Sequence, residues 1–258
     1  MKALLLAGAI AALGILPAGA ETLRVATSAD YPPWESVDSA GNMVGFDIDL
    51  GNAVCARIEA DCEWTNQAYD GLLPALVAGQ YDLIISAISI TEERKKKINF
   101  SIPYAQAPAS FGTIGDRFGA PADKAALTAA LAGKSIGVQG ASIFENLVNR
   151  HFVDTSVRVY QRADEIIADL RTGRLDAAVM EISAWEEFAG ANKDFGLTMF
   201  GPALTYDAYP ELGEGIGFGL AKDADDLKAR VDAAIAALID DGTIAKLSEK
   251  WFGYDVSP

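Results

Sequence analysis

The sequence predicts an α/β fold of two lobes joined by a two-strand hinge. Short apolar strands alternate with amphipathic helices after residue 20, and one helix-to-strand unit occurs twice. A glycine-rich strand and two helices near the C-terminus would return the chain to the first lobe. We therefore expect lobe 1 to contain residues 21–108 and 214–258, lobe 2 to contain residues 109–213, and a cleft to separate them.

The first 20 residues have the pattern of a secretory signal peptide. Lys2 precedes an apolar stretch, and the small residues of "PAGA" end at Ala20, where we expect cleavage. The alternative is a membrane anchor, but the stretch is short and its end is cleavable. No cysteine follows in a lipid-anchor motif, and no later segment reaches the ~18 unbroken apolar residues of a membrane span.

The chain is strongly acidic, with a formal net charge of −15. Removal of the signal peptide removes Lys2 and no acidic residue, so the mature charge is (21 − 1) − 36 = −16. Nucleic acids and anionic lipids would repel such a protein. We therefore expect no nucleic-acid partner.

Cys55 and Cys62 are the two cysteines of the sequence. Two cysteines this close in an exported chain are expected to form a disulfide. The alternative is a metal site, but two cysteines and the distant His151 do not make a ligand set. We expect no metal and no cofactor.

Hydrophobic spacing predicts the individual elements. In "GFDIDLGNAVCARIEA" (45–60), apolar residues recur about one helical turn apart, so this segment is expected to be helical. Further helices are predicted at 70–80, 142–152 and 223–253, the last broken at Asp241-Gly242. Strands are predicted at 22–28, 62–67, 81–87, 133–142, 176–181 and 213–222.

The repeated unit is "LPALVAGQYDLII" (73–85) and "IADLRTGRLDAAV" (167–179), offset by 94 residues. In each copy a helix is expected to end at a glycine, Gly79 or Gly173, because a left-handed C-cap favours glycine. An aspartate then precedes an apolar strand. Chance similarity between two ordinary helix-to-strand turns is the alternative to two similar lobes.

Polar or small residues follow the apolar part of each predicted strand. Ligands of open α/β sheets bind beyond the carboxyl ends of strands, so these residues are expected to line the cleft. The strand ends carry Ser28, Ser86, Ala87, Ser89, Ala141, Ser142, Met180 and Glu181.

Arg94 occupies an unusual place for a cation. It lies near the start of the helix predicted in "SITEER", where positive charge opposes the helix dipole. Ser89 with Glu92 fits a capping box, and Thr91 is the alternative N-cap. A guanidinium there would bind a carboxylate through two hydrogen bonds, and Glu181 across the cleft would bind a cation. Together they predict a site for an α-amino acid.

Tyr31 and Tyr69 are expected in loops after strands. They could form flat walls around a ligand side chain, including a cationic one. Core packing is the alternative for any aromatic residue, and we expect it for Trp34. His151 is expected to face solvent, and nothing near it indicates catalysis.

Four segments, "VGFDIDL", "YDLIISAISITEER", "FSIPY" and "DGTIAKLSEKWFG", resemble the polar amino acid-binding proteins of ABC importers, the bacterial extracellular solute-binding family 3. The resemblance covers nearly all of the mature chain. It implies a type II periplasmic binding protein that works as a monomer without cofactor. Its implied partners are a small-molecule amino acid and an inner-membrane ABC permease with its ATPase.

The resemblance also assigns roles to residues. Arg94 matches the arginine that binds the ligand carboxylate, helped by Ser89, Ser142 and backbone N–H groups near Ala141. Ser86 and Glu181 match the groups that bind the ammonium, and Tyr31 and Tyr69 match the aromatic pair around the side chain. The implied ligand-binding residues are Ser28, Tyr31, Tyr69, Ser86, Ala87, Ser89, Arg94, Ala141, Ser142 and Glu181.

Two residues depart from the family pattern. The ammonium partner is usually Asp rather than Glu181, and Ser28 stands where basic amino acid binders often carry an acid. The Cys55–Cys62 spacing looks like the branch that binds lysine, arginine, ornithine, histidine and some opines, so the ligand stays open among these and glutamine.

Two further functions are alternatives. One is a cyclohexadienyl dehydratase-like enzyme with Glu181 as general acid, although the acid of those enzymes falls where this chain has Ala184. The other is a sensory ligand-binding domain, which is normally fused to a membrane span or a kinase.

Overall fold

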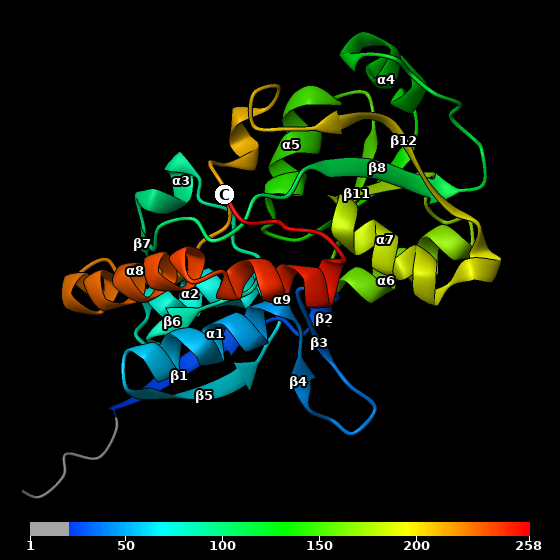
Figure 1. Cartoon of the computed structure of the whole chain (residues 1–258). Coiled ribbons are helices and arrows are strands. Elements are labelled where there is room, and N and C mark those ends of the chain that lie inside the picture. Colours follow the sequence, from blue (N-terminus) through cyan, green and yellow to red (C-terminus); the bar gives the residue numbers. More distant parts are fainter. Residues whose placement is uncertain (1–20) are drawn as a thin grey trace, which may run out of the picture.

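The computed structural model describes residues 21–258, which form two α/β lobes (Figure 1). The predicted signal peptide and its cleavage after Ala20 lie outside the described residues. Within 21–258 no helix combines the length and the apolar character that crossing a membrane requires. The predicted α/β fold with two lobes is confirmed.

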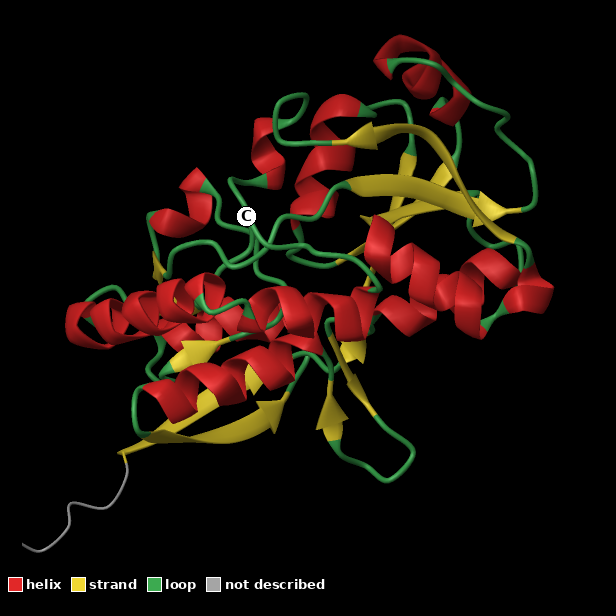
Figure 2. Cartoon of the chain, in the orientation of Figure 1, coloured by secondary structure: helices red, strands yellow, loops and turns green. Residues whose placement is uncertain are grey.

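Lobe 1 is built on a five-stranded sheet in the order β5-β1-β6-β13-β7. Strand β1 is parallel to both β5 and β6, whereas β13 is antiparallel to β6 and β7. A small sheet of β2, β3 and β4 projects beside it (Figure 2). The strands are β1 (Glu21–Thr27), β2 (Asp30–Tyr31), β3 (Glu35–Val37), β4 (Met43–Val44), β5 (Ala60–Asn66), β6 (Leu83–Ile84), β7 (Asn99–Phe100) and β13 (Gly219–Leu220).

Helices cover both faces of this sheet because successive side chains of a strand point to opposite faces. Val25 and Leu83 belong to the core beneath α1, α8 and α9, while Ala26 and Ile84 pack against α2. The helices of lobe 1 are α1 (Phe46–Arg57), α2 (Tyr69–Val77), α3 (Glu92–Lys95), α8 (Asp225–Asp240) and α9 (Thr243–Phe252).

Lobe 2 contains the second five-stranded sheet, in the order β10-β9-β11-β8-β12. Strands β10, β9 and β11 are parallel, and β8 is antiparallel to its neighbours β11 and β12. The strands are β8 (Ala109–Ile114), β9 (Ser135–Gln139), β10 (Ser156–Tyr160), β11 (Ala177–Glu181) and β12 (Leu197–Leu204). The helices are α4 (Lys124–Leu131), α5 (Ile143–His151), α6 (Ala163–Arg171), α7 (Ile182–Ala191) and the short 3₁₀ turns Lys193–Phe195 and Pro210–Leu212.

The chain crosses between the sheets twice, after β7 and after β12 (Figure 1). The two crossing segments pair with each other: Tyr104 N donates to Ile216 O, and Ile216 N donates to Ala105 O, both at 2.9 Å. Backbone bonds thus tie the crossings side by side. The exact lobe boundaries, 108/109 and 213/214, stay predictions.

The predicted repeat is the same structural unit in both lobes. In each copy the aspartate before the strand accepts a hydrogen bond from the backbone of the neighbouring parallel strand. Asp82 Oδ2 accepts from Arg24 N at 2.8 Å, and Asp176 Oδ2 accepts from Ser135 N at 2.9 Å. The glycines that end the helices are left-handed, as predicted: Gly79 (φ +73°) and Gly173 (φ +72°).

Several local predictions are confirmed and others are wrong. Cys55 and Cys62 form the expected disulfide, which joins α1 to β5. Trp34 is fully buried, with its ring 4.7 Å from that of Phe252. Neither tyrosine lies in a loop as predicted: Tyr69 is the first residue of α2, and Tyr31 belongs to the short strand β2.

Of the two predicted N-caps, Thr91 is confirmed and Ser89 is wrong, because α3 begins at Glu92 and Thr91 Oγ1 accepts from Arg94 N at 3.2 Å. His151 does not face solvent freely. Its imidazole contacts the side chains of Lys124 and Glu211 and packs edge-on against Tyr209. The pattern of α5 alone did not reveal these contacts, because they come from other segments of lobe 2.

Candidate functional site

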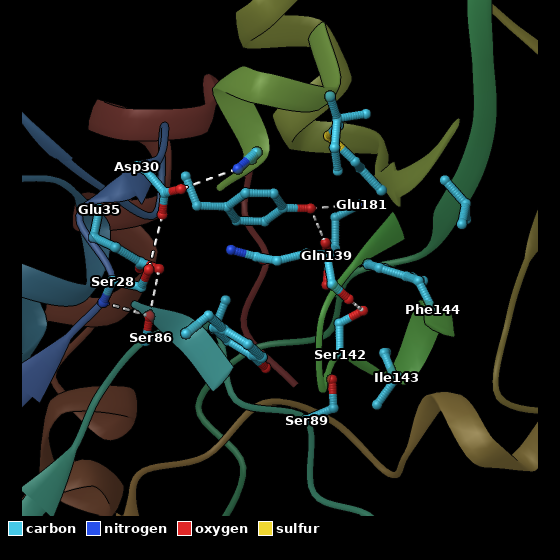
Figure 3. Close-up of a pocket in the computed structure, with 17 residues that line it drawn as sticks. Ser28, Asp30, Glu35, Ser86, Ser89, Gln139, Ser142, Ile143, Phe144 and Glu181 are labelled. Carbon is cyan, nitrogen blue, oxygen red and sulfur yellow. Dashed lines mark hydrogen bonds between the residues drawn. The ribbon is translucent and has the colours of Figure 1, made fainter. Parts of the chain in front are cut away.

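A hollow lies between the lobes, where the carboxyl ends of β1, β6, β9 and β11 meet (Figure 3). Parallel neighbouring strands end at the same edge of a sheet, which explains why distant segments of the sequence converge here. Residues from the predicted set that line the hollow are Ser28, Tyr31, Tyr69, Ser86, Ala87, Ser89, Ser142 and Glu181. Arg94 and Ala141 lie just outside this lining.

The lobe 1 wall is a connected chain of hydroxyls and carboxylates. Ser28 N donates to Ser86 Oγ at 3.0 Å, and Ser86 Oγ donates to Glu35 Oε1 at 2.8 Å. Ser28 Oγ donates to Asp30 Oδ1 at 2.9 Å. Two acids that the sequence analysis did not single out, Asp30 and Glu35, therefore belong to the site. Their signal was present, since both lie in "DYPPWE" directly after the first strand.

Behind this wall, Glu35 lies beside Asp47, and both acids are buried. Burial, and then the charge of Asp47, raises the pKa of Glu35 well above its usual value. Burial raises the pKa of Asp47 to about 6. Two like charges this close disfavour each other's ionised form. Glu35 Oε2 has no hydrogen-bond partner among the described residues.

Asp47 also fixes the backbone of the site. Its Oδ2 accepts from Ala87 N at 2.7 Å, and its Oδ1 accepts from Tyr104 OH at 2.8 Å. Ala87 has a left-handed φ of +45°, which a residue with a Cβ rarely adopts. The hydrogen bond that Ala87 N donates to Asp47 stabilises this turn, which places Ser86 and Ser89 on either side of it.

Ala141, at the end of β9, has the same left-handed conformation, with φ +59°. Its N–H already donates to Glu145 Oε2 at 2.9 Å, so a ligand carboxylate would compete with that contact. Ser142 is the N-cap of α5: its Oγ accepts from Glu145 N at 3.3 Å and donates to Gln139 O at 2.6 Å. Both strand ends that face each other across the hollow thus turn through a left-handed alanine.

Arg94 is a buried cation whose hydrogen bonds go to uncharged oxygen atoms. The residue is only 7% exposed to solvent. Nη1 donates to Ser89 O at 3.0 Å, and Nη2 donates to Tyr69 OH at 3.2 Å and to Ala141 O at 3.1 Å. Ala141 belongs to the opposite lobe, so the guanidinium spans the cleft. A guanidinium has five N–H donors, which leaves capacity for a carboxylate.

Glu181 is the matching acid of lobe 2, at the end of β11. It is 5% exposed, and its Oε2 accepts a hydrogen bond from Tyr31 OH of lobe 1 (Figure 3). Burial raises the pKa of Glu181 to about 7, although the Tyr31 hydrogen bond and the charge of Arg94 limit the rise. A cation placed beside Glu181 would favour its charged form, so this carboxyl is suited to hold an ammonium group.

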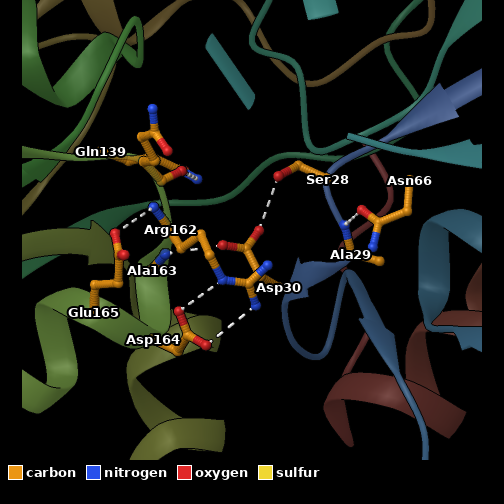
Figure 4. Close-up of polar contacts among 10 residues, drawn as sticks. Ser28, Ala29, Asp30, Asn66, Gln139, Arg162, Ala163, Asp164 and Glu165 are labelled. Atoms are coloured by element: carbon orange, nitrogen blue, oxygen red, sulfur yellow. Dashed lines mark hydrogen bonds and ion pairs between the residues drawn. The ribbon is translucent and has the colours of Figure 1, made fainter. Parts of the chain in front are cut away.

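Two more contacts join the lobes directly. Asp30 Oδ2 accepts from Ala163 N, the first residue of α6, at 3.0 Å (Figure 4). Trp34 Nε1 donates to Ser183 Oγ of α7 at 3.0 Å. Arg162, beside Ala163, is paired with Asp164 and does not contact Asp30 by a hydrogen bond. Both lobes therefore meet in a closed arrangement around the hollow.

This geometry defines a class: a two-lobed protein that places an arginine and a carboxylate on opposite sides of a hollow between its lobes. Residues 23–254 match the model of the bacterial extracellular solute-binding proteins, family 3, and the chain belongs to that family. The resemblance predicted from the sequence is confirmed.

The relatives are similar over nearly their whole length. The chain is 37% identical to the lysine/arginine/ornithine-binding periplasmic protein of Escherichia coli K12, covering 98% of this chain and 95% of that one. It is 32% identical to the ABC transporter arginine-binding protein 1 of the same organism, covering 98% and 99%. Among solved structures, an ancestral arginine-binding protein bound to arginine matches with a TM-score of 0.82 and 32% identity, covering 92% and 100%.

Proposed function

We propose that this protein captures a polar or basic L-amino acid in the periplasm and delivers it to the permease and ATPase of an ABC importer. The observation that carries the proposal is the pairing of Arg94 on lobe 1 with Glu181 on lobe 2. Both are buried beside one hollow, and neither has an ion-pair partner among residues 21–258. An α-amino acid supplies a carboxylate for Arg94 and an ammonium for Glu181.

The remaining predicted residues have supporting roles in this proposal. Ser89 and Ser142 lie next to the expected carboxylate position, and Ser86 lies on the wall that faces Glu181. Tyr31 and Tyr69 contribute rings beside the ligand, and their hydroxyls already contact Glu181 and Arg94. A bound ligand would replace part of these hydrogen bonds. The tyrosines would then contribute mainly their rings, which line the ligand site.

Closure provides the mechanism. A ligand shifts the protein toward a closed state only to the extent that it binds that state better. Arg94 and Glu181 belong to different lobes, so an amino acid reaches both only when the lobes are closed. The direct contacts from Asp30 and Trp34 to lobe 2 add to the stability of that state. We propose that the protein works as a monomer, with lobe boundaries near 108/109 and 213/214.

A thermal-shift screen of the mature, refolded protein tests this function. The panel contains the common amino acids, ornithine, citrulline, octopine and nopaline. A ligand at about 100 times its dissociation constant should add roughly 2.7 kcal/mol of stability, which is several degrees in Tm. A shift with at least one α-amino acid supports the proposal, and no shift with any of them contradicts it.

A cyclohexadienyl dehydratase-like activity is the second candidate, and one observation favours it. The pKa of Glu181, near 7 because of burial, would suit a general acid. Incubation with prephenate or arogenate tests it directly. Formation of an aromatic product would establish the enzyme, and its absence at high protein concentration would remove this candidate.

A further inference from the structure

The last six residues of the chain pack beside the segments that cross between the lobes. Helix α9 ends at Phe252, and Gly253 turns the backbone with a left-handed φ of +77°. The segment 253–258 then runs back from the end of α9 toward the crossing segments, as the red trace of Figure 1 shows. Its path is fixed by contacts with both the crossings and lobe 2.

Two contacts of Val256 anchor the segment near the first crossing. Val256 O accepts a hydrogen bond from Gln106 N at 2.8 Å, and Gln106 directly follows Tyr104 and Ala105, which pair with the second crossing. The side chain of Val256 is buried in the same apolar core as Tyr104 and Ala105. The segment is therefore held to lobe 1 at both of its ends, by α9 and by Val256.

Between these two anchors the segment reaches lobe 2. Tyr254 OH donates to Glu186 Oε2 of α7 at 3.3 Å. Partial burial, and then the charge and the hydrogen bond of Glu186, raise the pKa of Tyr254 to about 12. The hydroxyl therefore keeps its proton at neutral pH and stays a donor to the carboxylate.

A second aromatic residue of lobe 1 contacts the same face of α7. Trp34 Nε1 donates to Ser183 Oγ at 3.0 Å. Ser183 and Glu186 are three positions apart, which places them on one face of the helix. Phe252 lies between the two donors, with its ring centroid 4.7 Å from that of Trp34 and 6.1 Å from that of Tyr254. Rings at these separations pack against each other, so lobe 1 presents one aromatic row to α7.

We infer that the segment 253–258 is a strap that limits how far the two lobes separate. Hinge opening rotates one lobe against the other about the crossing segments. Because Val256 is bound beside these segments, α7 can move away from lobe 1 only after Tyr254 releases Glu186. No residue of the strap lines the hollow, so the strap would restrain opening without taking part in ligand recognition.

Three variants separate the strap from a general loss of stability. Tyr254→Phe removes the hydroxyl and keeps the ring, and a chain that ends at Gly253 removes the whole strap. Tyr160→Phe is the matched control, because Tyr160 OH also donates to a carboxylate, Asp169 Oδ2 at 2.7 Å, but both residues belong to lobe 2.

The measurement is the distance between the lobes in the refolded, ligand-free protein, by double electron–electron resonance. Spin labels are attached to Ser39→Cys in lobe 1 and Lys193→Cys in lobe 2, because both positions are exposed. The two native cysteines are bonded to each other and take no label. The ratio of long to short distances should rise about twofold or more in Tyr254→Phe, as expected for the loss of one hydrogen bond. It should rise further in the shortened chain and stay unchanged in Tyr160→Phe.

The Glu186→Ala background tests whether the effect passes through α7. Tyr254→Phe should add nothing there, because both changes remove the same hydrogen bond. An undiminished shift in that background would overturn the contact with Glu186 as the cause. Equal distance distributions in the wild-type protein, Tyr254→Phe and the shortened chain would overturn the strap itself. If the shortened chain fails to fold because Val256 leaves the core, the point variants decide alone.

Discussion

Asp30 of lobe 1 caps a helix of lobe 2: its Oδ2 accepts the backbone N–H of Ala163, 133 residues further along the chain, at 3.0 Å. Helix α6 begins after Arg162, a residue with no side-chain oxygen to accept from the first turn. The carboxylate that fills this place comes from the opposite lobe. The cap therefore exists only while the lobes are closed.

Replacing Asp30 with Ala should favour the open state. A helix cap is worth about 0.5–2 kcal/mol, so ligand affinity should fall several-fold, mainly through faster dissociation. Stopped-flow fluorescence measures the two rates, and small-angle X-ray scattering measures the larger radius of gyration of the ligand-free variant. Asp164→Ala is the control, because Asp164 lies in the same helical turn but contacts only its own lobe. Equal dissociation rates in the two variants would contradict the inter-lobe cap.

Arg94→Ala should abolish ligand binding without unfolding the protein. The variant removes a buried cation that has only uncharged partners, so the fold loses little. The ligand carboxylate loses its charge partner, at a cost of about 2–5 kcal/mol, which is about thirtyfold or more in affinity. Calorimetry measures the affinity, and thermal unfolding measures the fold. Arg94→Lys keeps the positive charge but not the planar guanidinium. Its ligand affinity should therefore lie between those of the wild-type protein and Arg94→Ala. Wild-type affinity in Arg94→Ala would refute the assigned role.

Glu181 should make the stability of the ligand-free protein fall with rising pH. Its pKa is raised by burial from 4.5 to about 7, so the folded protein binds more protons than the unfolded chain between these values. The free energy of unfolding then falls by about 1.4 kcal/mol per pH unit while Glu181 titrates in this window. Above the window, Glu181 causes no further change with pH.

Glu181→Gln should remove that part of the slope. The raised pKa values of Glu35 and Asp47 act in the same direction, so a smaller slope should remain in the variant. Urea denaturation between about pH 4.5 and about pH 7 measures the difference. Parallel curves for wild type and variant would show that Glu181 titrates normally in the folded state. The same variant should bind amino acids much more weakly.

The disulfide should contribute to stability and not to recognition. Cys55 and Cys62 are separated by 7 positions and lie on α1 and β5, away from the hollow. Replacing both with Ser should cost about 2–3 kcal/mol of unfolding free energy by the chain-entropy model. Ligand affinity at a temperature where both forms are folded should stay unchanged. A large loss of affinity would mean that α1, which carries Asp47, shifts when the bridge is removed.

Local sequence patterns predicted the helices and strands, and they predicted the edge of the sheets at which the site lies. Periodic apolar residues located the long helices, and glycine at the C-cap located both helix-to-strand turns, because these depend on residues a few positions apart. The strand ends could be predicted to converge because parallel strands end at one edge. The competing N-caps Ser89 and Thr91 both fit the same local rule, so sequence alone could not choose between them.

The acidic wall could not be predicted in the same way. Glu35 and Asp47 are 12 positions apart and meet only because α1 packs beside β3. Asp47 has the pattern of an acid in the first turn of a helix, which is usually exposed, yet here it is fully buried. The contact between Asp30 and Ala163 depends on the relative orientation of the two lobes. A local sequence pattern cannot predict that orientation.

The tryptophans give the protein a built-in optical reporter. The indole N–H of Trp34 bonds to the opposite lobe, whereas those of the other three tryptophans bond within their own lobe: Trp64 to Asn52, Trp185 to Ser110 and Trp251 to Asp49. A change in emission on ligand addition can therefore be assigned to a single residue by comparison with Trp34→Phe. The unlabelled protein is thus a ready starting point for a fluorescent amino acid biosensor.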